Sequence, residues 1–397
     1  MSSAVPLAPA SRRWFPLESV RGVAALSVVA FHAYQNQMVD IVGGHDRLPL
    51  LTKLLATTSD LAVDLFFVLS AFVLFLPVAR AGLAGEPPRS AMDMLLRRCA
   101  RLIPLYYTVV FLVWGISNTR LPGNWHDLVL HLTFTQVHSE TYIYWTDGPA
   151  WSLAVEFHFY VLMALAAIFI GRRCRRVTTR RARLVALAIF PVALMVLGTA
   201  WMAYHSVVVH TSYTDWPVWF GPIAKGMAFG SGMMLAVLTA AGVEFRSAWV
   251  RPTACAVAVA LIACSVVRRS DDVATEWLHY LDIAASLLVV GSLVLARRTD
   301  PRWLLWQPLV FLGSISYGVY LLHEPLMRIL RANGAVPARD GQLIDVWITA
   351  TTVAMVSMAA AWVSSIIIER NGLRLLAQFD GRGGFREYYP HLVATGF

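Results

Sequence analysis

Charged residues are scarce in this chain. Only 14% of its 397 residues are Asp, Glu, Lys or Arg, whereas about 25% is usual for a soluble globular domain. Hydrophobic residues make up 57% of the sequence and the mean hydropathy is +0.59. This composition excludes an ordinary soluble domain and indicates an integral membrane protein. The positive charge is nearly all arginine, in short clusters between apolar segments, which argues against nucleic acid as a partner.

Cysteine is also scarce. Cys99, Cys174, Cys255 and Cys264 show no metal or redox spacing and form no even framework in one loop. We therefore expect no metal site and no tightly bound cofactor. No low-complexity tract or internal repeat is found. No small-x-small cleavage site follows the first apolar stretch, so we expect a retained first span and not a cleaved signal peptide.

Long apolar runs are abundant, and about 17–25 residues of this kind suffice to cross a bilayer. We predict an all-α membrane protein of about ten transmembrane helices. The predicted spans are 19–38, 59–79, 102–117, 151–170, 184–203, 218–240, 253–267, 280–296, 305–322 and 343–368. The shorter apolar stretch 128–137 is interpreted as an interfacial or re-entrant piece.

The distribution of basic residues predicts the orientation, because cytoplasmic loops are enriched in Lys and Arg. With the N-terminus inside, 23 of the 33 basic residues fall in inner connections and 8 in outer ones. Both termini are therefore predicted to be cytoplasmic. The domain division follows as a disordered tail over 1–18, one transmembrane domain over 19–370 and a cytoplasmic tail over 371–397.

Two ionisable residues, Arg21 and His32, lie inside the first span. Eleven helical steps bring their side chains to within about 20° of one another and separate them by about 16 Å. Ionisable residues inside a membrane usually mark a pathway or a reactive site. A neutral imidazole can accept a proton, although an isolated intramembrane histidine is often a hydrogen-bonding core residue.

A basic run, Arg97, Arg98 and Arg101, precedes the third span. Arg98 and Arg101 are three residues apart and share one helix face. Two guanidinium groups suit bidentate phosphate binding, so a phosphorylated cytosolic donor is one interpretation. Anchoring at the inner membrane surface is the other. The seven arginines within 172–183 fit orientation and contact with lipid headgroups.

Further polar residues occur at other spans. Glu156 lies about one and a half turns into the fourth span and is either a catalytic group or a polar clamp between helices. Before it, Asp147 or Ser152 is expected to cap the helix, and Trp151 to anchor it at the interface. The second span carries Asp64 and Ser70, with Asp64 expected to pair with an arginine. The ninth span contains Ser316 and Tyr317 and ends at the outer boundary with His323.

These residues predict a polar cavity within the membrane, with a base and a phosphate-binding site. They do not by themselves separate an enzyme from a transporter, which also uses intramembrane His, Arg and Glu. The sequence shows no inverted repeat of the kind found in many transporters. A non-catalytic export or assembly subunit is a further alternative.

Five motifs, in order along the chain, resemble those of the acyltransferase-3 family of membrane O-acyltransferases. They are Arg21-Gly22-Val23-Ala24-Ala25-Leu26 through His32, Asp64 to Phe72, Arg97 to Pro104, Trp151 to Glu156, and Ser316 to His323. The chain departs from the family pattern at two places. Ala71 stands where the family more often has glycine, and Phe157-His158 stands where many members have an acidic residue followed by Gln.

The resemblance implies about ten helices around a central cavity that acyl-CoA enters from the cytoplasm. His32 becomes the catalytic histidine and Arg21 the group that orients or stabilises it, with Glu156 placed beside them. Arg98 and Arg101, with Arg97, would meet the phosphates of coenzyme A. The supporting cavity residues are Asp64, Ser70, Trp151, Ser152, Ser316, Tyr317 and His323.

We therefore expect a multi-pass enzyme of a bacterial inner membrane, with an arginine- and alanine-rich usage that fits an actinobacterium. It would transfer acetyl, or a short dicarboxylic acyl group such as succinyl, from acyl-CoA to a sugar hydroxyl of an envelope polysaccharide or glycolipid. Acylation of a macrolide or another secondary metabolite is the alternative. Direct transfer with His32 as general base and an acyl-imidazole intermediate both stay open, as does the oligomeric state.

Overall fold

A computed structural model of the chain describes residues 15–38, 49–87, 90–269, 272–296, 301–339, 342–369 and 371–372. The described residues form helices and turns, and their only β-pairing is an isolated bridge between Phe245 and Ala296. The all-α prediction is therefore confirmed. The predicted tails fall largely outside the described residues, although helix α1 already begins at Phe15.

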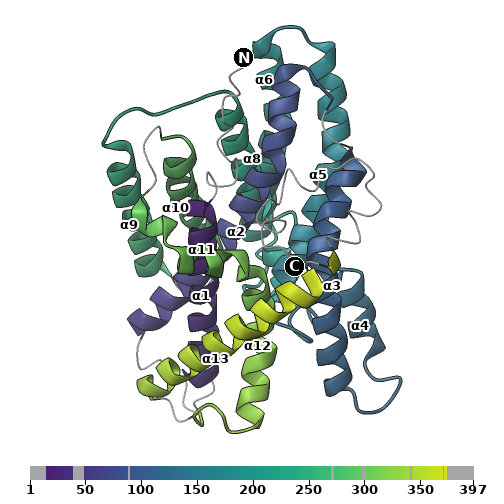
Figure 1. Ribbon diagram of the computed structural model, residues 1–397, viewed down its shortest axis with the longest axis vertical. Helices are drawn as coiled ribbons and strands as arrows, with labels where there is room; N and C mark the ends of the chain where they lie inside the picture. The colour runs from purple at the N-terminus through teal and green to yellow at the C-terminus, as the bar shows by residue number, and fades with distance from the viewer. Residues whose placement is uncertain are drawn as a thin grey trace, which may run out of the picture.

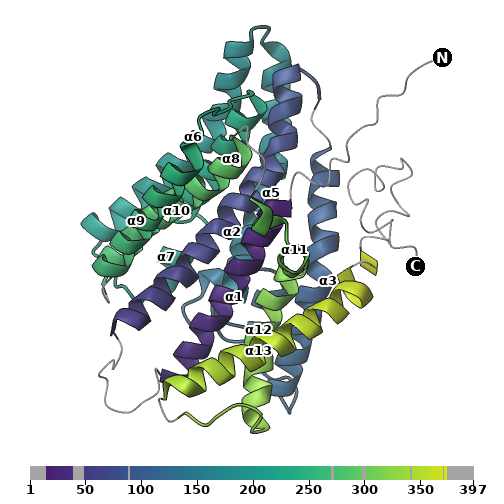
Figure 2. The ribbon, with the colours of Figure 1, turned by 60° about the vertical axis from the view of Figure 1, so that its left-hand side comes forward.

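Two long helices occupy the middle of the bundle (Figure 1). They are α1 (Phe15–Met38) and α2 (Pro49–Ala84), and they pack side by side. On one side of α2 lie α8 (Gly226–Ala240), α9 (Val250–Arg268) and α10 (Ala274–Val294), with α6 (Arg180–Ala203) outside them (Figure 2). The α6 helix continues into a short π-helix, Tyr204–Val208.

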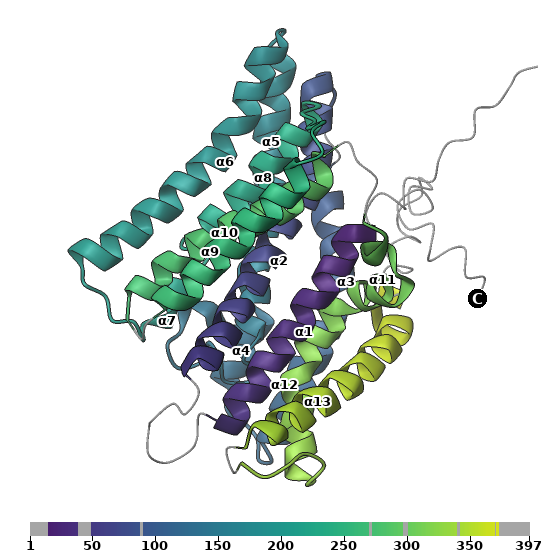
Figure 3. The same ribbon diagram turned by 90° about the vertical axis from the view of Figure 1, so that its left-hand side faces the viewer.

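The other side of α1 is covered by the C-terminal helices (Figure 3). These are α11 (Gln307–Ser314), α12 (Ser316–Ala332) and α13 (Leu343–Ser364), which continues into a π-helix over Ser365–Glu369. Helices α3 (Ala91–Ser117) and α5 (Ala150–Arg176) close the bundle next to α12 and α2. The central position of α1 and α2 places Asp64 fully inside the protein and leaves His32 only partly exposed.

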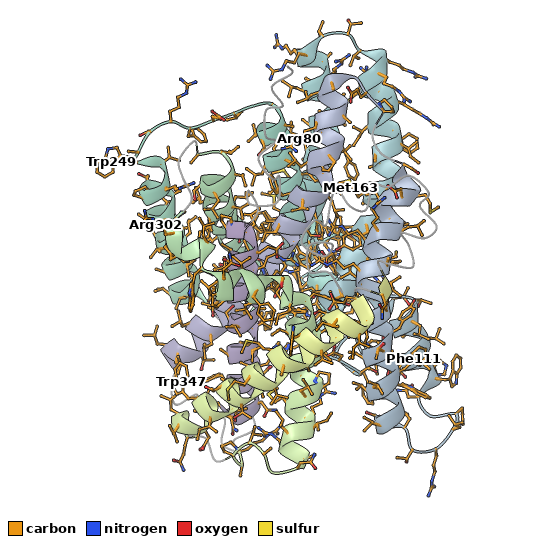
Figure 4. All side chains as sticks on the ribbon, viewed as in Figure 1. Arg80, Phe111, Met163, Trp249, Arg302 and Trp347 are labelled. Carbon is orange, nitrogen blue, oxygen red and sulfur yellow. The ribbon has the colours of Figure 1, made fainter. Side chains whose placement is uncertain are left out.

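Among the described residues, seven helices are long and apolar enough to cross a membrane. They are α2, α3, α5, α6 with its π-helical extension, α9, α10 and α13 with its extension. Large apolar side chains such as Phe111, Trp249 and Trp347 project outward, whereas Met163 is buried (Figure 4). This pattern is that of a multi-pass membrane protein. The total of about ten spans and the cytoplasmic location of both termini stay predictions.

Two predicted spans are not single helices. The predicted span 218–240 contains most of α7 (Trp216–Phe220) and α8, which are separated at Gly221-Pro222, where proline lacks the N–H that a continuous helix needs. The predicted span 305–322 contains the end of a 3₁₀ turn (Arg302–Leu305), α11 and the start of α12. The stretch 128–137 forms α4 (Trp125–Leu132) and part of a 3₁₀ turn, Gln136–His138, two short helices in keeping with the expected short piece.

Candidate active site

Two histidines from opposite ends of the chain meet between α1 and α12. His32 Nδ1 lies 2.9 Å from His323 Nε2, and the ring centroids are 5.0 Å apart. His323 is fully buried, whereas His32 keeps part of its surface exposed. His323 therefore lies inside the protein, and α12 continues nine residues beyond it; its predicted position at the outer boundary stays a prediction.

Small residues make this meeting possible. A Cβ on Gly22 of α1 would come within 2.9 Å of Gly313 N, and a Cβ on Gly313 of α11 would overlap the carbonyl oxygen of Glu18. A Cβ on Gly318 would come within 2.8 Å of the Ala361 Cβ on α13. Glycine thus lets α11 and α12 lie directly against α1 and α13, and this contact brings the two imidazoles together.

The hydrogen bonds of His323 determine which ring nitrogen of neutral His32 carries the proton. His323 Nδ1 lies 2.6 Å from the Tyr320 carbonyl oxygen, which can only accept, so Nδ1 carries the proton. In the neutral ring, His323 Nε2 is then an acceptor and His32 Nδ1–H must donate to it. The same reasoning leaves His32 Nε2 without a proton. A nitrogen in that state can take a proton from a hydroxyl group.

Helix α12 carries three side chains with aromatic rings on one face: Tyr317, Tyr320 and His323. The Tyr317 hydroxyl donates to the Leu102 carbonyl of α3 over 2.7 Å. The Tyr320 hydroxyl lies 2.8 Å from Ser152 Oγ of α5. One helix face therefore runs from the arginine-bearing part of α3, past α5, to His32. The period of three was visible in the sequence, although Tyr320 was not selected.

A polar chain connects Glu156 to Arg98. Glu156 accepts a short hydrogen bond from Ser70 Oγ, and Ser70 Oγ lies 3.4 Å from the Tyr160 hydroxyl. The Arg98 guanidinium carbon lies 5.8 Å from the centroid of the Tyr160 ring. Arg98, Tyr160 and Tyr317 share the lining of a small cavity between α3, α5 and α12. The structure therefore places Glu156 on the arginine side, in contact with Ser70 and not, among the described residues, with His32.

The other three arginines of the predicted site, Arg21, Arg97 and Arg101, lie at the same end of the bundle as Arg98. Arg21 and Arg101 both lie within electrostatic range of Glu369, at the end of α13. Arg21 also lies 3.7 Å from Glu18, and Arg97 Nε donates to Asp93 over 3.0 Å. Arg21 is thus grouped with Arg101 and not with His32, from which it is about 16 Å away along a continuous helix.

The sequence led us to expect that Asp64 pairs with an arginine, but its partner in the structure is a histidine. Its Oδ2 lies 2.6 Å from His279 Nδ1 of α10, and the arginine pairs instead with Asp60, where Arg269 Nη2 lies 2.7 Å from Oδ2. Sequence reasoning missed His279 and Arg269, because both lie at one end of otherwise ordinary apolar helices.

The start of α5 also differs from expectation. The N-cap is Pro149, without a side-chain cap, and the Asp147 side chain is buried with neither oxygen hydrogen-bonded in the described structure. Burial, and then the nearby Glu324 carboxylate, raises the pKa of Asp147 well above its ordinary value of 3.8. Ser152 Oγ donates to the Pro149 carbonyl over 3.0 Å, and Ser316 Oγ to the Gly313 carbonyl over 2.8 Å.

Trp151 packs against aromatic residues, and its role as an interface anchor stays a prediction. Its ring centroid lies 4.5 Å from that of Phe220, and Lys225 Nζ lies 5.8 Å from the Trp151 centroid and 4.8 Å from the Phe220 centroid. Lys225 is 4% exposed and follows the break between α7 and α8. Two aromatic faces and a buried ammonium form a cation–π contact next to the predicted site.

Comparison with known proteins places this geometry in a family. A family model described as an acyltransferase domain, that of the acyltransferase-3 family, matches residues 16–367. Acyltransferase MdmB of Streptomyces mycarofaciens is 26% identical over 381 residues, covering 91% of this chain and 92% of its own. A candidate membrane-bound transacylase of Komagataeibacter xylinus, BcsY, is 25% identical over 93% of this chain and 89% of its own.

A third relative is longer. A candidate peptidoglycan O-acetyltransferase of Bacillus subtilis, YrhL, is 24% identical over 79% of this chain, and the match covers 49% of its own length. No solved structure matches the chain significantly.

Proposed function

The chain belongs to the acyltransferase-3 family, and from this membership we propose that it is a membrane-embedded O-acyltransferase that uses cytosolic acyl-CoA. Acetyl, or a short dicarboxylic acyl group such as succinyl, would pass to a sugar hydroxyl of an envelope polysaccharide or glycolipid at the bacterial inner membrane. The observation that carries the proposal is the pairing of His32 Nδ1 with His323 Nε2 at 2.9 Å. Family membership favours a transferase over a transporter.

The reaction needs one base, which His32 supplies in this proposal. The acceptor hydroxyl oxygen attacks the thioester carbonyl carbon while His32 Nε2 takes the hydroxyl proton. The tetrahedral intermediate then expels the thiolate of coenzyme A, which takes the proton back from the imidazolium. The products are an ester and free coenzyme A, and His32 returns to its starting state. Throughout, His32 Nδ1–H donates to His323, which holds the ring in one orientation.

The donor site follows from the grouping of the arginines. Arg98 and Arg101 lie on one face of α3 at the end of the bundle that the basic residues predict to be cytoplasmic. Two guanidinium groups suit the phosphates of coenzyme A. The pantetheine arm would extend from there along the α12 face that carries Tyr317 and Tyr320 toward His32. Arg97 is already paired with Asp93 and would contribute less.

The acceptor is proposed from the relatives. One of them is named for peptidoglycan O-acetylation, a sugar hydroxyl in the cell envelope. The names of the two relatives that match end to end state acyl transfer without an acceptor. A secondary metabolite such as a macrolide therefore remains the alternative acceptor.

The enzyme assay uses the purified full-length protein in lipid nanodiscs with acetyl-CoA or succinyl-CoA and candidate acceptors, and it measures free coenzyme A. We expect acceptor-dependent release by the wild type and none by His32→Ala. His205→Ala is the matched control, because His205 bonds to Thr211 away from this site. Wild-type turnover by His32→Ala would refute its role. Mass spectrometry of envelope glycans and secreted metabolites, with and without the gene, identifies the acceptor.

A further inference from the structure

A second buried cluster of ionisable residues lies between α2 and α10, and the proposed reaction does not use it. It comprises Asp60 and Asp64 of α2, Glu276, His279 and Asp282 of α10, Arg269 at the end of α9, and Lys225. Three distances define it: Asp60 Oδ2 to Arg269 Nη2 is 2.7 Å, Asp64 Oδ2 to His279 Nδ1 is 2.6 Å, and Glu276 Oε2 to His279 Nε2 is 3.7 Å.

Part of this cluster is unsatisfied. Asp282 is 0% exposed, and neither of its carboxylate oxygens has a hydrogen-bond partner in the described structure. Asp64 is 1% exposed and its Oδ1 is likewise without a partner. A buried carboxylate oxygen without a partner is costly. The orphaned oxygens therefore call for a cation that the described side chains do not supply.

The same oxygens are close together. Asp64, His279 and Asp282 each offer one ligand atom, and these three atoms lie within 4.8 Å of one another. They come from two helices: Asp64 from α2, and His279 and Asp282 from one face of α10, three residues apart. The α2 and α10 helices pack directly against each other. Two carboxylates and an imidazole thus converge on one point.

The charges of the cluster lead to the same conclusion. Among the described residues it holds four carboxylates (Asp60, Asp64, Glu276 and Asp282) and two fixed cations, Arg269 and Lys225. With all four carboxylates ionised and the imidazole neutral, the state that metal binding requires, the net charge is about −2, and an uncompensated charge inside a membrane protein is expensive. One divalent cation brings the total to zero.

We propose that Asp64, His279 and Asp282 bind one divalent metal ion of the zinc, manganese or cobalt type. Imidazole together with carboxylate oxygen suits these metals, whereas magnesium and calcium favour ligands that are all oxygen. The metal takes the place of the proton between His279 Nδ1 and Asp64 Oδ2, and the orphaned oxygens of Asp282 become ligands. The sequence-based expectation of no metal is thereby revised.

The proposed ion is structural. It joins α2 to α10, and α2 packs against α1, which carries His32. The acyl transfer described above uses none of the three ligands as a reacting group. The metal site therefore stands or falls independently of the proposed function.

The first test needs no variant. The full-length protein, purified in detergent, is analysed for metals, and we expect about one ion of the zinc, manganese or cobalt type per chain. Chelation should lower the thermal unfolding midpoint, and added Zn²⁺ should restore it, whereas Mg²⁺ or Ca²⁺ should not. Co²⁺ should give a visible absorption band from a nitrogen-containing site. A chain without metal, with a midpoint that neither chelator nor Zn²⁺ moves, would overturn the proposal.

Variants locate the ion. Asp282→Asn and His279→Gln should each reduce metal affinity at least about tenfold and make the midpoint insensitive to chelator. Asp272→Asn, at an exposed residue two positions before α10, is the control and should retain the ion. If protons neutralise the cluster instead, both the wild type and Asp282→Asn are free of metal and have the same thermal unfolding midpoint. That result would overturn the proposal. Stoichiometric metal that survives both substitutions would place the ion elsewhere and would also overturn the proposal.

Discussion

Removing the His323 side chain is the sharpest test of how His32 is held. In His323→Ala, His32 Nδ1 loses its acceptor at 2.9 Å, and the Tyr320 carbonyl loses the donor at 2.6 Å. Leaving a buried polar group unpartnered costs about 1–3 kcal/mol. If that cost falls on the transition state, kcat drops by about 5- to 160-fold. The KM for acyl-CoA should not change, because Arg98 and Arg101 lie at the other end of the site.

His323→Gln provides the conservative comparison. A glutamine can accept from His32 through Oε1 and donate to the Tyr320 carbonyl through its amide, so part of the lost rate should return. The pH profile of kcat should also change in His323→Ala and less in His323→Gln, because the ring of His32 is then free to carry its proton on either nitrogen. A residue that only fills space would not move that profile.

The assay is acyl-CoA turnover in nanodiscs at saturating acceptor, with kcat and KM fitted separately. Asn333→Ala is the matched control, because it removes a hydrogen bond to Ile329 at the far end of the same helix. It should leave kcat and the pH profile unchanged. The reasoning is refuted if His323→Ala retains wild-type kcat, or if it raises KM for the donor while kcat stays constant.

Three further predictions concern the donor site, a buried carboxyl and a close helix contact. The double substitution Arg98→Ala with Arg101→Ala should raise the KM for acyl-CoA about tenfold or more with little change in kcat. The reason is that each charge-assisted phosphate contact contributes about 1.5–3 kcal/mol. An unchanged KM in steady-state kinetics would exclude the phosphate site. Because its pKa is raised, Asp147 binds its proton more tightly in the folded state, so the free energy of unfolding falls as the pH rises above 3.8. Asp147→Asn should flatten that decline in thermal unfolding measured at a series of pH values above 3.8, and an unaltered slope would contradict it. Gly313→Ala places a Cβ against the Glu18 carbonyl and should cost about 1–3 kcal/mol, seen as a lower unfolding midpoint; an unaffected midpoint would show that α11 can move away.

The sequence predicted the helices well because each of them is encoded locally. An apolar run of sufficient length is visible without its neighbours, and α5 and α9 lie close to the windows expected for them. The interruption between α7 and α8 was readable as well, since Gly221-Pro222 lies inside the predicted span 218–240. It was missed because hydropathy outweighed the proline signal.

Contacts between residues on different helices could not be predicted in this way. His32 and His323 are 291 residues apart, and Asp64 and His279 are 215 apart. No local pattern specifies which helices become neighbours, so Asp64 was expected to pair with an arginine and the contact between His32 and His323 was not predicted. What determines the first pairing is the close contact at Gly22 and Gly313. Gly22 belongs to the first recognised motif and Gly313 lies three residues before the fifth, and their role appears only once the helices are packed.

The continuous course of α1 decides whether Arg21 can act on the same substrate carbonyl as His32. The helix is uninterrupted from Phe15 to Met38, so eleven residues separate Arg21 from His32 by about 16 Å along the axis. A group that stabilises an oxyanion must lie about 3 Å from the reacting oxygen, and the hydroxyl must reach His32 at the same moment. One substrate carbonyl cannot satisfy both residues.

Arg21 is also grouped with Arg101 and Glu369. We therefore infer that Arg21 acts on the phosphorylated end of the donor. It follows that Arg21→Ala should resemble the Arg98 and Arg101 substitutions in its kinetics, and not those of His32.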